Sequence, residues 1–175
     1  MSPSLPATKA KYIFDTSPSI MLLEKCKLRS QLLRFAENNT LRAPLRVMEE
    51  YGVGDGENPK PSVSIFREVF SVISVDLDNE LLPFFNYDSS SGEIWVISYV
   101  RQHPDFCCVI DEMFARNICS LLNIKVTGTI GIINEMKMCG LLDPRDLKAI
   151  RNTIKNCRFY LSRDLLRQLD FICKP

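Results

Sequence analysis

The chain has 175 residues, of which 46% are hydrophobic, so it can bury a full core and is neither a disordered segment nor a small disulfide-stapled scaffold. Its formal net charge of +1 excludes a generally basic nucleic-acid binder. If the protein handles nucleic acid, a metal ion or a local patch must supply the positive charge. A single histidine, His103, excludes mechanisms that need two histidines and histidine-rich zinc sites.

The seven cysteines contain no C-x-x-C pair, which argues against a thiolate zinc site or a thioredoxin-like redox site. Most of them lie in apolar stretches, where a free cysteine behaves as a small buried hydrophobe. A reducing, cytoplasmic location is therefore expected. The N-terminus has no apolar signal core and no run is long enough to span a bilayer, so we expect no membrane association.

After a predicted flexible arm at residues 1–10, short apolar stretches alternate along the chain with amphipathic ones. The apolar stretches predict strands at residues 11–14, 41–45, 72–77, 106–110 and 124–126, with a further extended stretch at 157–161. The predicted helices lie at residues 16–26, 31–37, 47–51, 64–70, 78–86, 93–101, 113–122, 130–139, 144–156 and 163–172. The Gly- and Pro-rich segment 52–61 predicts a mobile surface loop. This alternation is typical of one α/β domain over residues 1–175, with a parallel sheet covered on both faces.

Two predicted strands end directly in a carboxylate, Asp15 after the first and Asp111 after the fourth. Sites in open parallel sheets form beyond the carboxyl ends of the strands, so these acids are expected to meet in space. Glu50 and Glu93, both near helix starts, could complete the cluster. Gathered carboxylates repel one another unless a cation compensates them, and an all-oxygen site suits Mg²⁺ or Mn²⁺. Such a metal binds phosphate oxygens and activates water, which predicts phosphodiester hydrolysis.

Each of these acids also has a purely structural explanation. Asp15 and Asp111 could cap the helices that follow them, and Ser90 and Glu93 have the spacing of a capping box. Glu50 could be a solvated acid on an exposed helix face. The metal-site prediction therefore depends on the four acids taken together and not on any one of them.

Five short motifs occur in a characteristic order: YIFDTS at 12–17, VMEEY at 47–51, GE at 92–93, CVIDEMFAR at 108–116 and VTGTIG at 126–131. Together they resemble the PIN-domain nucleases, particularly the VapC-like bacterial and archaeal branch, over roughly residues 11 to 172. The family's V-x-x-E motif selects Glu50 over Glu49.

The resemblance implies a three-layer α/β/α fold and an endoribonuclease that depends on Mg²⁺ or Mn²⁺. It also implies frequent homodimers and, for many members, neutralisation by a small antitoxin protein. The acids that it assigns to the metal and to catalysis are Asp15, Glu50, Glu93 and Asp111. The supporting groups that it suggests are Thr16, Glu112, Arg116, Thr127 and Thr129.

The chain departs from the family pattern at two places. Glu112 stands where the family usually has a second Asp, and segment 52–88 is longer than usual, so that Asp88 could replace Glu93 in a different register. One alternative function is a catalytically weak or inactive PIN-like module that binds RNA or protein. A second, an aspartyl phosphate on Asp15, fits poorly. Ser17 stands where haloacid-dehalogenase-type phosphatases need an Asp, and Lys125 lies near the start of its strand, whereas a receiver domain requires a Lys at the end of its last strand.

Overall fold

The computed structural model describes residues 9–54, 60–157 and 162–174. Five short strands form one sheet in the order β3-β2-β1-β4-β5, and every pairing is parallel. The strands are β1 (Lys11–Phe14), β2 (Thr40–Pro44), β3 (Ser71–Ile73), β4 (Cys107–Val109) and β5 (Val126–Thr127). The predicted parallel sheet is confirmed.

The helices fill the segments between and after the strands. They are α1 (Thr16–Ile20), η1 (Met21–Lys25), α2 (Arg29–Asn38), α3 (Leu45–Val53), α4 (Val63–Val69), η2 (Asn79–Phe85), α5 (Gly92–Gln102), α6 (Met113–Leu121), α7 (Thr129–Met138), α8 (Pro144–Asn156) and α9 (Arg163–Ile172).

Strand β1 lies at the centre of the sheet, where Tyr12 is in register with Leu41 of β2 on one side and Cys107 of β4 on the other. Its residues Ile13 and Phe14 are completely buried. A central strand covered on both faces has no solvent side, which explains why this stretch is continuously apolar and does not alternate.

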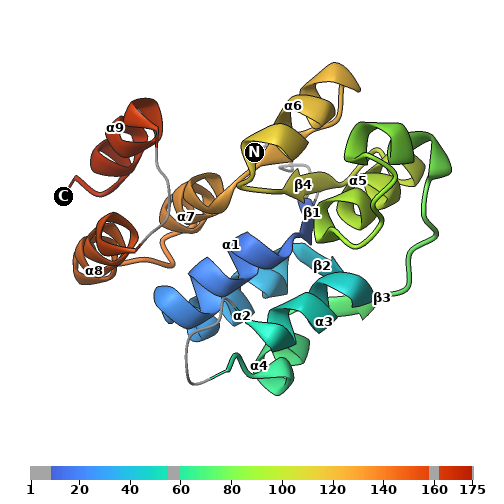
Figure 1. Ribbon diagram of the computed structural model, residues 1–175. Helices are drawn as coiled ribbons and strands as arrows, with labels where there is room; N and C mark the ends of the chain where they lie inside the picture. Colours follow the sequence, from blue (N-terminus) through green and yellow to red (C-terminus); the bar gives the residue numbers. More distant parts are fainter. Residues whose placement is uncertain (1–8, 55–59, 158–161, 175) are drawn as a thin grey trace, which may run out of the picture.

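Helices cover both faces of the sheet, as expected for a three-layer α/β/α fold (Figure 1). Helix α5 packs on β1, β2, β4 and α6, whereas α2 packs on β2 and α4. Helices α8 and α9 lie together at one end of the molecule, away from α3 and α5 (Figure 1).

Two predicted helices take other helical forms. The predicted break near Cys26 is confirmed: η1 is a π-helical turn that ends where the Cys26 N–H donates to the Met21 carbonyl. The segment predicted as a helix at 78–86 forms a 3₁₀ helix, η2, that contains Pro83, and a proline interrupts α-helical hydrogen bonding.

Parts of three predictions lie outside the described residues: the arm at 1–8, the middle of the 52–61 loop and the extended stretch at 158–161. Among the helices that the structure describes, none has the length and apolar character needed to cross a membrane.

Candidate active site

Asp15 follows β1 directly and occupies the N-cap position of α1, yet its side chain makes no capping hydrogen bond. Its main chain is held on both sides, because its N–H donates to the Val109 carbonyl over 3.0 Å and its carbonyl accepts from Ser19 Oγ over 2.7 Å. The carboxylate is buried, and neither of its oxygens has a hydrogen-bond partner among the described residues. The helix-cap explanation therefore does not account for this acid.

Glu50 reaches the same region from α3. Its Oε2 accepts a 2.7 Å hydrogen bond from Thr16 Oγ1, and its Oε1 lies 3.5 Å from Arg46 Nε. The side chain of Glu50 is only 27% exposed, so it is not the solvated surface acid of the alternative explanation. Glu49, by contrast, is half exposed at 54% and lies 3.7 Å from Arg46.

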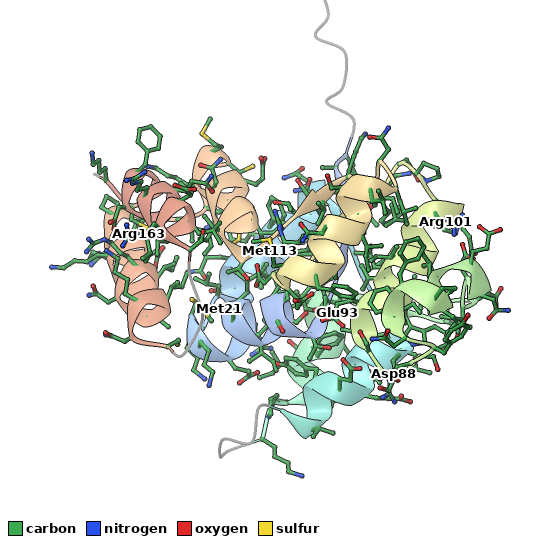
Figure 2. All side chains as sticks on the ribbon, turned by 45° about the horizontal axis from the view of Figure 1, so that its top comes forward. Met21, Asp88, Glu93, Arg101, Met113 and Arg163 are labelled. Atoms are coloured by element: carbon green, nitrogen blue, oxygen red, sulfur yellow. The ribbon has the colours of Figure 1, made fainter. Side chains whose placement is uncertain are left out.

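Glu93 lies in the first turn of α5, close to the middle of the molecule (Figure 2). The predicted capping box between Ser90 and Glu93 is wrong, because the helix begins at Gly92 with Ser91 as its N-cap residue. The Ser91 hydroxyl donates to the Glu93 carboxylate, while the Ser90 carbonyl accepts from Arg46. Glu93 is thus free of a capping role.

Asp15, Glu50 and Glu93 line one cavity of about 350 Å³, together with Thr16, Ser17, Val53 and Gly54. Gly92 keeps space open between two of the acids. A Cβ atom at that position would lie 2.7 Å from Glu50 Oε2 and 3.0 Å from Asp15 Oδ1. The GE motif therefore supplies both an acid and the room beside it.

The three carboxylates affect one another electrostatically. Burial raises the pKa of Asp15 well above its usual value, and Glu93 and then Glu50 add to the rise. The amides of Thr16 and Ser17, close by but outside hydrogen-bonding geometry, oppose it only in part. Burial also raises the pKa of Glu50, against the hydrogen bond from Thr16. The cavity therefore favours a cation that would offset this negative charge.

Asp111 does not line this cavity. Its Oδ1 accepts from the Thr129 N–H over 2.7 Å and its Oδ2 from Thr129 Oγ1 over 2.5 Å, which ties the end of β4 to the start of α7. It lines a separate cavity of about 150 Å³. Burial raises the pKa of Asp111, and the bonds from Thr129 oppose that rise.

The other predicted supporting residues surround Asp111. Glu112 caps α6 by accepting from the Ala115 N–H over 2.7 Å, so Glu112 performs the capping role considered for Asp111. Arg116 Nη1 donates to the Ile110 carbonyl over 2.7 Å. Thr127 lies in β5, and a Cβ atom at Gly131 would collide with its hydroxyl.

Asp88, considered as a replacement for Glu93, has a structural role in the loop before α5. Its Oδ1 accepts from the Ser90 N–H over 2.8 Å, and hydrogen bonds from Ser90 lower its pKa. Figure 2 shows Asp88 farther from the middle of the molecule than Glu93. Glu93, not Asp88, lines the cavity with Asp15.

The cavity suits a hydrated divalent cation. Within the described ranges, no three His, Cys, Asp or Glu side chains converge closely enough to form a ready-made metal site. Mg²⁺, however, keeps several of its waters and binds proteins through one or two carboxylates. The unpartnered Asp15 oxygens, with Glu50 and Glu93 on the same cavity, provide donors of that kind.

Arg46 is a residue of this region that the sequence reasoning missed. Its Nε and Nη2 donate to the Ser90 carbonyl over 3.0 and 2.9 Å, so one side chain links α3 to the loop before α5. The position of Arg46, four residues before Glu50 on a helix, could have indicated their ion pair. The contact with Ser90 joins distant segments and has no local signal.

A family model described as a PIN domain matches residues 11–170 of the chain. No curated protein and no solved structure matches the chain.

Proposed function

Because the chain belongs to the PIN-domain family, whose members are generally nucleases, we propose that it is an endoribonuclease that depends on Mg²⁺ or Mn²⁺. The observation that carries the proposal is the buried Asp15 carboxylate, which has no partner among the described residues and shares a cavity with Glu50 and Glu93. Burying a carboxylate without a partner costs stability, and groups of this kind are concentrated at functional sites.

In this proposal Asp15, Glu50 and Glu93 hold the metal. When bound, the metal would polarise a phosphate oxygen and lower the pKa of a bound water. Thr16 orients Glu50 through its 2.7 Å hydrogen bond, and the burial of Asp15 itself keeps bulk water away from its carboxylate. Asp111 is the fourth acid on the strength of its motif, and its carboxylate would have to leave Thr129 to take part.

We propose a toxin of a toxin–antitoxin pair, acting as a homodimer in the cytoplasm and held inactive by a small antitoxin. The resemblance of the motifs to the VapC-like branch supports the pair and the dimer. The seven free cysteines support a reducing compartment.

A second candidate is a PIN-like module that binds RNA or protein with little or no catalysis. It is favoured by the engagement of both Asp111 oxygens and by the lack, among the described side chains, of a ready-made three-ligand site. Titration with Mn²⁺ separates the two candidates. A working site should raise the free energy of unfolding by about 2.7 kcal/mol at a hundredfold excess over Kd, whereas no shift at millimolar Mn²⁺ would favour the module.

The direct test is cleavage of a panel of single-stranded RNAs with Mn²⁺, with Mg²⁺ and with EDTA. We expect metal-dependent cleavage by the wild type and its loss in Asp15→Asn and Asp111→Asn. Glu49→Gln is the matched control, since Glu49 is the exposed neighbour of Glu50 and does not line the cavity. Cleavage that survives Asp15→Asn would refute the assignment of the site.

A further inference from the structure

Positive charge is concentrated at the C-terminal end of the sequence. Residues 137–175 contain nine Lys and Arg against four Asp and Glu, whereas residues 1–136 contain thirteen against seventeen. The near-neutral total therefore hides a basic C-terminal part and an acidic remainder. Such asymmetry within one chain is typical of proteins that bind a polyanion.

Four of these nine basic residues lie on one face of α8. Arg145, Lys148, Arg151 and Lys155 recur at intervals of three or four residues, which puts them on the same side of a helix. The opposite side carries Leu147, Ile150 and Ile154, which are buried in the core. The basic side is therefore the side that α8 leaves uncovered.

A groove of about 690 Å³ runs between α8 and α9 along this face (Figure 1 shows the two helices together). We call it the α8–α9 groove; its lining residues are Pro144, Arg145, Lys148, Arg151, Asp170, Cys173 and Lys174. It lies on different elements from the cavity of Asp15.

Asp170, the acid among the described lining residues, is already neutralised. Asp170 Oδ1 lies 2.6 Å from Arg151 Nε and 2.7 Å from Lys155 Nζ, so two cations share one carboxylate. Lys148 and Lys174 are exposed, and neither side chain has an acidic partner within 4.0 Å in the part of the chain that the structure describes. Their ammonium groups can thus bind an external anion without first breaking an ion pair.

We propose that the α8–α9 groove is a docking surface for the sugar–phosphate backbone of single-stranded RNA. The choice of RNA as the polyanion rests on the proposed function. Lys148 and Lys174 contact phosphates directly, and Arg145, 93% exposed and 3.3 Å from Asp143, adds to the attraction. The groove supplies, as a local patch, the positive charge that the whole chain lacks.

The test measures binding of a fluorescein-labelled 20-nucleotide oligouridine by anisotropy, in EDTA, over a series of salt concentrations. Each phosphate contact contributes about 0.7 to the log–log salt slope for a single strand, so Lys148→Ala/Lys174→Ala should reduce the slope by about 1.4. When the salt is raised from about 50 to 200 mM, the factor by which the affinity falls should then be roughly sevenfold smaller for the variant than for the wild type. Alanine is the best helix former, so α8 should fold normally.

Arg67→Ala/Lys125→Ala is the matched control. It removes the same charge from two exposed basic residues, one on α4 and one just before β5, outside the groove. If both double variants bind alike, or if the wild type does not bind at low salt, the groove is refuted. A wild type that cleaves RNA with Mn²⁺ but binds no better than its groove variant refutes the groove alone. Groove-dependent binding without metal-dependent cleavage supports the groove and refutes the nuclease.

Discussion

Asp15 combines two properties that folded proteins usually keep apart, complete burial and an ionisable group whose oxygens lack partners among the described residues. The other buried polar side chains that the structure describes, those of Ser19, Ser98 and Thr129, each have a hydrogen-bond partner. Ser19 donates to the Asp15 carbonyl, Ser98 accepts from the Asp78 N–H, and Thr129 donates to Asp111. The cost of an unsatisfied buried group is thus concentrated at one residue of the candidate site.

This cost has a definite pH dependence. Because burial raises the pKa of Asp15 in the folded chain, the folded state holds its proton to higher pH than the unfolded state does. The resulting loss of stability begins as the pH rises above about 4, the value for an unfolded Asp, and is complete above the folded pKa. Without metal, we expect Asp15→Asn to be more stable than the wild type at pH 7.5, by on the order of 1 kcal/mol.

Urea denaturation in EDTA at several pH values measures this difference, which should shrink as the pH falls towards 4. Asp105→Asn is the control, because Asp105 is exposed and its hydrogen bond from Lys11 lowers its pKa. That variant should show no gain at pH 7.5. An Asp15→Asn variant that is less stable than the wild type at pH 7.5 would contradict the prediction.

At the scale of elements, the site depends on how α3 is held against the loop before α5. Arg46 makes this connection with two nitrogens on the Ser90 carbonyl and an ion pair with Glu50. We expect Arg46→Met to weaken Mn²⁺ binding about tenfold or more, the range usual for groups that orient metal-binding carboxylates. Calorimetric titration of Mn²⁺ checks the prediction.

Arg46→Lys separates geometry from charge. Lysine keeps the positive charge near Glu50 but cannot place two fixed nitrogens on one carbonyl oxygen. If the link between the elements matters, the Lys variant should bind Mn²⁺ as poorly as the Met variant. Wild-type affinity in Arg46→Lys would show that charge alone is enough.

The elements themselves were largely predictable because their signals are local. Short apolar runs indicated the strands, and Asp143 with Pro144 indicated the start of α8, where the structure has a capping box completed by Asp146. The 3₁₀ form of η2 was less predictable, because it depends on the proline inside the helix. The short length of β3 was also less predictable, because it depends on how neighbouring elements pack.

The site was predictable only in part. Sequence order indicated Asp15, Glu50 and Glu93, which share a cavity. The position of Asp111 depends on register, because Phe14 pairs with Val109 and Asp111 therefore lies one residue farther along than Asp15. Successive side chains on a strand point to opposite sides, and no local pattern reveals the register between strands so far apart.

On the scale of the whole molecule, the acidic cavity and the basic groove occupy different elements of one nearly neutral chain. Asp170 limits the charge of the groove by pairing with Lys155 and Arg151, which also lower its pKa. We expect Asp170→Asn to bind the oligouridine a few-fold more tightly at low salt, because two cations lose their internal partner. Anisotropy titration measures the affinity, and weaker or unchanged binding would contradict the proposed groove.

The central position of β1 has a consequence for how the chain acquires its shape. The strands on either side of it are β2, which comes next in the sequence, and β4, which lies more than ninety residues away. The Asp15 N–H finds its acceptor, the Val109 carbonyl, only when β4 docks. A chain that ends before β4 therefore cannot complete the surroundings of Asp15. Glu50 and Glu93 both precede β4 in the sequence, so the strand that completes the enclosure of Asp15 comes later in the chain than the acids that share its cavity.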